Sequence, residues 1–180
     1  MIEALLRGKL LREQENMEDV LTSSVFGMLQ YVAPQLGLFL FLTEAKTLED
    51  VCPLRVLTTA RGCRQATVLY RFWPKWPRCE PDVVLHIRGD AGLRQLVGIE
   101  AKFASGKSSE ADELEDRPND QLAREWVDLH DEADHLCAQP VLVYLTADVS
   151  CPKPQIRDSL DELRRKSVFG VPEPVICWLS

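Results

Sequence analysis

Two short apolar segments joined by a turn signal constrain this chain most strongly. Residues 83–87 and 96–99 have the composition of strands, and residues 89–92 (Gly-Asp-Ala-Gly) lie between them. Glycine and aspartate at this place are typical of a turn, so the pattern predicts an antiparallel hairpin. A hairpin centred on Ala91 places Asp82 opposite Glu100, because each residue lies nine positions from that centre.

The hairpin also predicts how the side chains divide between the two faces of a sheet. Because side chains alternate along a strand, Asp82, Glu100 and Lys102 point to one face. The opposite face takes the apolar side chains of both strands: Val83, Leu85, Ile87, Val97, Ile99, Ala101 and Phe103. We therefore expect two carboxylates and an ammonium group to converge on the polar face of a sheet whose other face is apolar.

Metal-assisted hydrolysis of a phosphodiester needs such a trio. Mg²⁺, for which Mn²⁺ can substitute, binds oxygen ligands and usually takes one or two carboxylates together with water and phosphate. Asp82 and Glu100 are the candidate ligands, with the backbone carbonyl of Ala101 as a third. Lys102 would lie beside the attacking water, where it could orient or deprotonate that water and stabilise the charge on phosphorus.

The residues Pro81-Asp82 and Glu100-Ala101-Lys102 resemble the signature of the PD-(D/E)XK nuclease superfamily. The resemblance covers roughly residues 12–147 and implies a restriction-endonuclease-like α/β fold, a mixed sheet flanked by helices with an α-β-β-β-α-β core. An acidic helix including residues 18–27 precedes the signature, and a helix from about 118 to 136 and a strand at 141–146 follow it.

The resemblance implies two further site residues, each with a simpler alternative. It makes Glu18 an additional acid at the metal or the water, whereas Asn16 could instead cap a helix whose first turn holds Glu18 and Asp19. It places Gln121 at the site or on the DNA, whereas a surface glutamine fits the sequence equally well. Four residues after Gln121 this chain has Glu125, where the RecB-like branch has tyrosine.

Other features leave their own alternatives open. Glu100 and Lys102 could form an exposed ion pair of little consequence for stability. The loop at residues 73–78, which contains Lys75 and Arg78, could stack on bases and touch phosphates, although packing over the sheet edge is favoured. Lys107 follows Lys102 in a polar loop that could meet a DNA backbone.

Composition bounds the remaining expectations. The 180 residues fit a single domain, which could be the N-terminal part of a longer protein. The apolar run at 36–42 is too short to cross a membrane. We expect a cytoplasmic protein whose six scattered cysteines are reduced thiols. Its net charge of −7 opposes DNA binding, so a homodimer or a partner protein is expected to contribute affinity.

The sequence therefore predicts a Mg²⁺-dependent DNA endonuclease, in restriction, phage defence or a mobile element. The alternative is a catalytically silent scaffold or interaction subunit that retains the same fold within a nucleic-acid-processing complex.

Overall fold

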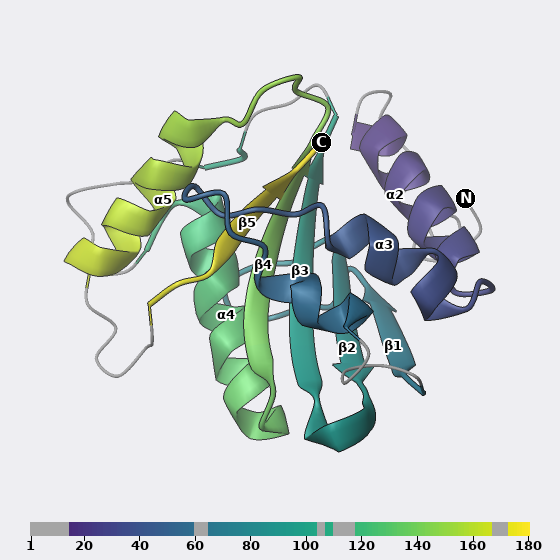
Figure 1. The fold of residues 1–180 in the computed structure, drawn as a ribbon. Helices are drawn as coiled ribbons and strands as arrows, with labels where there is room; N and C mark the ends of the chain where they lie inside the picture. Colours follow the sequence, from purple (N-terminus) through teal and green to yellow (C-terminus); the bar gives the residue numbers. More distant parts are fainter. Residues whose placement is uncertain (1–14, 60–64, 104–106, 110–117, 167–172) are drawn as a thin grey trace.

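A five-stranded mixed sheet with helices on both sides forms the framework of the protein (Figure 1). The computed structural model describes residues 15–59, 65–103, 107–109, 118–166 and 173–180. Its elements are α2 (Glu15–Leu29), η1 (Pro34–Leu36), α3 (Leu38–Leu42), η2 (Pro53–Thr58), β1 (Thr67–Phe72), β2 (Val83–Arg88), η3 (Asp90–Gly92), β3 (Arg94–Lys102), α4 (Gln121–Leu136), β4 (Gln139–Thr146), α5 (Lys153–Arg165) and β5 (Ile176–Leu179).

The strands lie in the order β1-β2-β3-β4-β5, antiparallel from β1 to β3 and parallel from β3 to β5. Val83 pairs with Ile99 and Val84 with Gly98, so the hairpin has the register predicted from its centre at Ala91. From α2 through β4 the main elements follow the expected α-β-β-β-α-β order. The predicted α/β fold class, a mixed sheet flanked by helices, is therefore confirmed.

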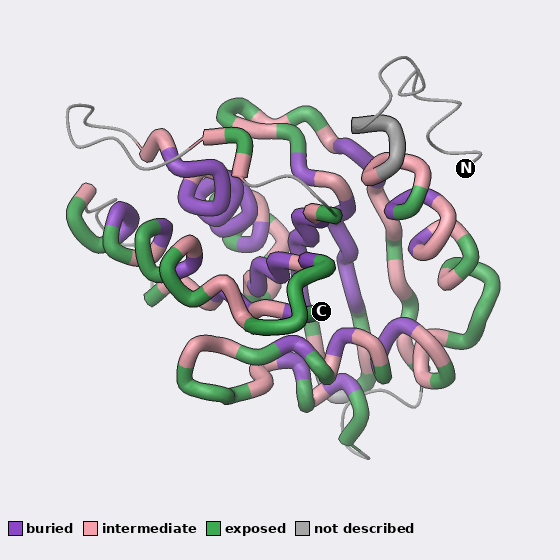
Figure 2. The backbone as a smooth tube through the Cα atoms, turned by 90° about the horizontal axis from the view of Figure 1, so that it is seen from above, coloured by how far each residue is buried: buried purple, intermediate pink, exposed green. Residues whose placement is uncertain are grey.

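Two apolar cores cover the two faces of the sheet. On one face Val83 and Leu85 pack with residues of α2, α3 and η2, including Phe26 and Phe39. On the other face residues such as Val84 pack with α4 and α5. Figure 1 shows α4 and α5 to the left of the sheet and α2 and α3 to its right. The buried residues gather at the centre of the molecule between these layers (Figure 2).

The expectation that one face of the sheet is polar is wrong. Leu96 and Val84, on the face of Glu100, are fully buried beneath α4. The amphipathic α4 supplies the cover, with Leu122, Trp126 and Leu129 turned to the sheet. On this face Asp82, Glu100 and Lys102 lie at one end of the hairpin, and His86, Arg88 and Arg94 lie nearer its turn.

Gly98 allows α4 to approach the sheet closely. A Cβ atom added to Gly98 would lie 3.2 Å from Leu142 Cδ1 and 3.3 Å from Leu129 Cδ2. These distances are tighter than ordinary van der Waals contacts, so a larger residue would push α4 or β4 away. The glycine thus helps set the distance between α4 and the hairpin.

Several element predictions differ in detail from the structure. The apolar run at 36–42 is buried at Leu38, Phe39 and Leu42. Leu40 is exposed because the short α3 buries one side, and Leu36, in η1, is exposed as well. The predicted acidic helix that includes residues 18–27 is α2, which begins at Glu15, and residues 1–14 lie outside the described residues. Among the residues that are described, no helix has the length and apolar character needed to cross a bilayer.

Candidate metal and phosphodiester site

Asp82 and Glu100 meet at the end of the hairpin. Asp82 precedes the first residue of β2, and its Oδ2 accepts a hydrogen bond of 2.8 Å from the backbone N–H of Ala101. Its Oδ1 accepts one of 3.2 Å from the indole N–H of Trp73. Lys102 Nζ lies 2.7 Å from Glu100 Oε1, with only 14% of its side chain exposed. Glu100 and Lys102 form a largely buried ion pair, so the alternative of an exposed ion pair is wrong.

Helix α2 brings Glu18 to the same place. Glu18 Oε1 accepts a hydrogen bond of 2.8 Å from the backbone N–H of Phe103, and its Oε2 lies 4.0 Å from Lys102 Nζ. Asn16 has helical backbone within α2, whereas an N-cap residue lies outside the helical conformation. The geometry therefore favours placement of Glu18 at the site over the capping alternative.

The first residue of α4 contacts Glu100 directly. Gln121 Nε2 donates a hydrogen bond of 2.5 Å to Glu100 Oε1, while its Oε1 accepts one of 2.7 Å from the backbone N–H of Ser108. Because that N–H can only donate, it orients the amide group of Gln121 with its NH₂ toward Glu100. Gln121 is 8% exposed, so it is not a surface glutamine.

Glu125 is a site residue that the sequence reasoning missed. It lies one turn after Gln121 on α4, is 1% exposed and, when protonated, hydrogen-bonds to the carboxylate of Glu100. The signal in the sequence was its spacing. Leu122 lies three residues before Glu125 and Leu129 four residues after it, which places Glu125 on the helix face that packs on the sheet. A carboxyl group on a buried helix face is exceptional and points to a polar neighbour.

Burial and mutual repulsion dominate the electrostatics of the site. Burial and the charge of Glu100 raise the pKa of Asp82 and of Glu125 well above their ordinary values. Burial alone would lower the pKa of Lys102, but Glu100, Asp82 and Glu18 raise it above the usual value for lysine. In the absence of a cation, Asp82 and Glu125 therefore hold their protons to a higher pH than ordinary carboxyl groups, and Lys102 keeps its positive charge.

The donor chemistry of the site fits a hard divalent cation such as Mg²⁺. Asp82 and Glu100 offer carboxylate oxygens, and the N–H of Ala101 faces Asp82, which turns its carbonyl to the same side of the strand. Glu125 Oε2 is buried and receives no hydrogen bond within the described part of the chain. The described residues contain no ready set of three acidic, histidine or cysteine ligands. Two carboxylates completed by water and phosphate are the usual protein share of a Mg²⁺ site.

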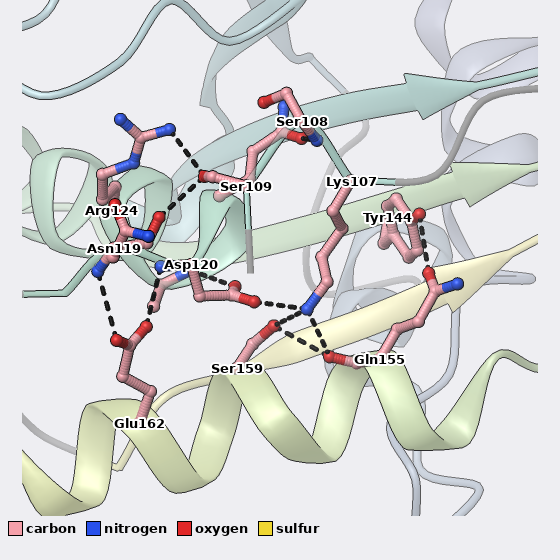
Figure 3. Close-up of polar contacts among 12 residues, drawn as sticks. Lys107, Ser108, Ser109, Asn119, Asp120, Arg124, Tyr144, Gln155, Ser159 and Glu162 are labelled. Atoms are coloured by element: carbon pink, nitrogen blue, oxygen red, sulfur yellow. Dashed lines mark hydrogen bonds and ion pairs between the residues drawn. The ribbon is translucent and has the colours of Figure 1, made fainter. Parts of the chain in front are cut away.

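The structure does not present Lys107 to a DNA backbone. Its side chain is 5% exposed, and Nζ pairs with Asp120 Oδ2 and donates to Gln155 O at 3.0 Å and Ser159 Oγ at 3.2 Å (Figure 3). The expected contact between Lys107 and DNA is therefore corrected: Lys107 neutralises a buried carboxylate and has no free surface for a phosphate.

The loop between β1 and β2 packs against α4. Trp76 Nε1 donates a hydrogen bond of 2.7 Å to Glu132. Arg78 forms ion pairs with Asp128 at 2.5 Å and with Asp131 at 3.0 Å. These contacts attach the loop to a helix, whereas the favoured prediction placed it over the sheet edge. Lys75 remains exposed, whereas Arg78 is partly engaged by α4 carboxylates and is less free to bind a phosphate.

Comparison with known proteins gives little beyond this geometry. No protein-family profile and no curated protein sequence matches the chain. A likeness was found to the structure of Pyrococcus furiosus SfsA in complex with Ca²⁺, with a TM-score of 0.32 and 15% sequence identity. It covers 64% of this chain and 48% of that chain, so the match spans about half of that protein's length. An overlap this low does not establish a shared fold.

Proposed function

We propose that this chain is a Mg²⁺-dependent nuclease of the PD-(D/E)XK kind that hydrolyses phosphodiester bonds in DNA. The observation that carries the proposal is the meeting of Asp82, Glu100 and Lys102 at one end of a hairpin. Glu18 from α2 and Gln121 from α4 reach the same point from opposite sides of the sheet. A structural ion pair between Glu100 and Lys102 alone would not require three further polar groups from other parts of the chain.

Each residue has a defined task in this proposal. Asp82, Glu100 and the carbonyl of Ala101 would hold the cation, which supplies a bound water of lowered pKa and shields the phosphate. Lys102, held in its charged form by its acidic neighbours, donates a hydrogen bond to the phosphate or the attacking water. Gln121 holds the Glu100 carboxylate in place, and Glu18 lies near enough to Lys102 to orient its ammonium group.

The direct test is a cleavage assay with plasmid, linear and single-stranded DNA and with RNA, in Mg²⁺, Mn²⁺ or EDTA. We expect cleavage of DNA in either metal and none in EDTA. Asp82→Ala should abolish cleavage and weaken Mn²⁺ binding in titration calorimetry. Asp90→Ala is the matched control, because Asp90 lies at the opposite end of the same hairpin and is exposed. Equal metal binding by wild type and Asp82→Ala would refute the site.

The scaffold alternative draws on a different observation. Residues 20–43 contain no charged side chain, yet Met28, Tyr31 and Leu36 are 66%, 92% and 75% exposed. Exposed apolar side chains without interspersed charge are typical of protein interfaces. A silent interaction subunit would use this surface and would have no need of a metal site, so the calorimetry separates the two functions.

A further inference from the structure

Trp73 and Asp82 are direct neighbours at the end of the paired strands β1 and β2. Trp73 follows Phe72, the last residue of β1, and Asp82 precedes Val83, the first residue of β2. Phe72 and Val83 are paired across these two antiparallel strands. The backbone N–H of Trp73 donates a hydrogen bond of 2.9 Å to the carbonyl oxygen of Asp82, which extends the ladder by one residue. The indole Nε1 donates a second one, of 3.2 Å, to the carboxylate oxygen Oδ1.

The backbone of Trp73 has a conformation that bulky residues rarely adopt. Its φ of 45° lies in the left-handed region, where a tryptophan is a true outlier. Consecutive strand residues normally point to opposite faces, yet Phe72 and Trp73 are both buried in the same core, with ring centroids 5.7 Å apart. The left-handed turn thus ends the alternation at the residue that contacts Asp82. Such outliers cluster at functional sites.

We propose that Trp73 is a positioning residue that holds the carboxylate of Asp82 ready for a metal ion. The inference rests on the function proposed above. The indole N–H can only donate, and it engages Oδ1 while the N–H of Ala101 engages Oδ2. One donor on each oxygen fixes the plane of the carboxylate. Each oxygen accepts more than one bond, so a lone pair remains on both for a cation.

The rest of the β1–β2 loop has a different role, which supplies a matched control. Trp76, three residues later, donates its indole N–H to Glu132 on α4 at 2.7 Å. This contact fastens the loop to the helix and does not involve Asp82 or Glu100. Replacing either tryptophan by phenylalanine removes one indole N–H and keeps an aromatic ring, so the two variants differ chiefly in which carboxylate loses its donor.

The experiment is titration of Mn²⁺ and Mg²⁺ into wild type, Trp73→Phe and Trp76→Phe by calorimetry, with the thermal midpoint of each measured in EDTA. We expect Trp73→Phe to bind metal about 10- to 100-fold more weakly, the range found when a group supporting a ligand is removed. Trp76→Phe should bind as wild type does. With DNA, Trp73→Phe should lower kcat and leave KM unchanged.

A spectroscopic readout guards against misfolding of the variant. In wild type labelled with ¹⁵N, the indole N–H resonance of Trp73 should shift on addition of Mg²⁺ more than that of Trp76. The positioning role alone would be overturned if wild type and Trp73→Phe bound metal with equal affinity. It would also be overturned if the indole resonance of Trp73 did not shift on addition of Mg²⁺. If wild type bound no metal, both this inference and the proposed function would fail.

Discussion

Lys102 is the residue on which the proposed chemistry depends most directly. Its ammonium group pairs with Glu100, and only 14% of its side chain remains exposed. The lysine is therefore held in one place and in one charge state rather than sampling solvent. An interaction that acts mainly in the transition state affects the rate more than it affects binding.

We expect Lys102→Ala to lower the single-turnover rate of DNA cleavage by at least about 10²- to 10³-fold, the usual cost of removing one donor to developing charge. Binding of DNA should change little. Lys102→Arg should also fail, because the larger, planar guanidinium group presents its donors in a different geometry from the compact ammonium group. The exposed Lys75→Ala serves as control. An alanine variant with a near-normal rate would remove Lys102 from the mechanism.

Glu125 makes the metal-free protein sensitive to pH. Its folded-state pKa is raised by burial and by Glu100, so its contribution to stability is present below about pH 4.5, its ordinary value, and is lost as pH rises through the raised pKa. Glu125→Gln keeps a hydrogen-bond donor toward Glu100 without a titrating proton. In EDTA, the variant should gain stability over wild type as the pH rises above 4.5, by up to about 1.4 kcal/mol per pH unit. Parallel denaturation midpoints from pH 4 to 8 would contradict this.

At the scale of elements, a buried polar network joins the segment at 107–109 to the start of α4 and to α5 (Figure 3). Asp120 caps α4 through Ala123 N and pairs with Lys107, while Glu162 on α5 accepts from the backbone N–H of Asn119 and of Asp120. These contacts hold the N-terminus of α4, and so place Gln121 against Glu100.

Lys107→Met should destabilise the protein by about 3–5 kcal/mol, because it leaves the fully buried Asp120 without its cation. The double variant Lys107→Met with Asp120→Asn should recover part of the loss, since asparagine keeps the cap and carries no charge. Lys46→Met, which breaks an exposed pair with Asp50, should have no measurable effect. Urea denaturation measures all three. A loss at Lys107 no larger than at Lys46 would show that the network carries little stability.

At the scale of the whole molecule, charge and exposed apolar surface both bear on assembly. The chain has a net charge of −7, and Lys107 and Arg78 are engaged by carboxylates. Few cations therefore remain near the site for a DNA backbone. The uncharged residues 20–43 offer exposed apolar side chains through which two acidic chains could meet without bringing like charges together.

We expect efficient cleavage to require self-association or a partner protein. The rate per enzyme should rise with protein concentration, together with the mass measured by light scattering, and a single chain should show a shallow salt dependence, since each phosphate contact adds about 0.9 to the slope. Tyr31→Lys should reduce association, whereas Leu69→Lys, at an exposed position of β1, should not. A monomer that binds duplex DNA tightly at physiological salt and cuts independently of concentration would refute this prediction.

The sequence by itself determined the local elements and the register of the hairpin. Alternating apolar residues and a glycine-containing turn specify strands and their centre, so the opposition of Asp82 and Glu100 followed from counting residues. Helical periodicity predicted a helix from about 118 to 136, and α4 begins at Gln121, directly after its N-cap residue Asp120. These features depend on neighbours within one strand pair or one helix, and such neighbours are visible in a linear pattern.

Only the tertiary structure decided which polar side chains are buried and whom they contact. Glu125 became a site residue because α4 approaches β3 across Gly98, and Lys107 became an internal cation because α5 covers it. Trp73 reaches Asp82 through a left-handed backbone turn that strand alternation does not predict. The physical reason is common to all three. Burial and pairing arise where elements distant in sequence meet, and the energy of a charged or polar group depends on those distant neighbours.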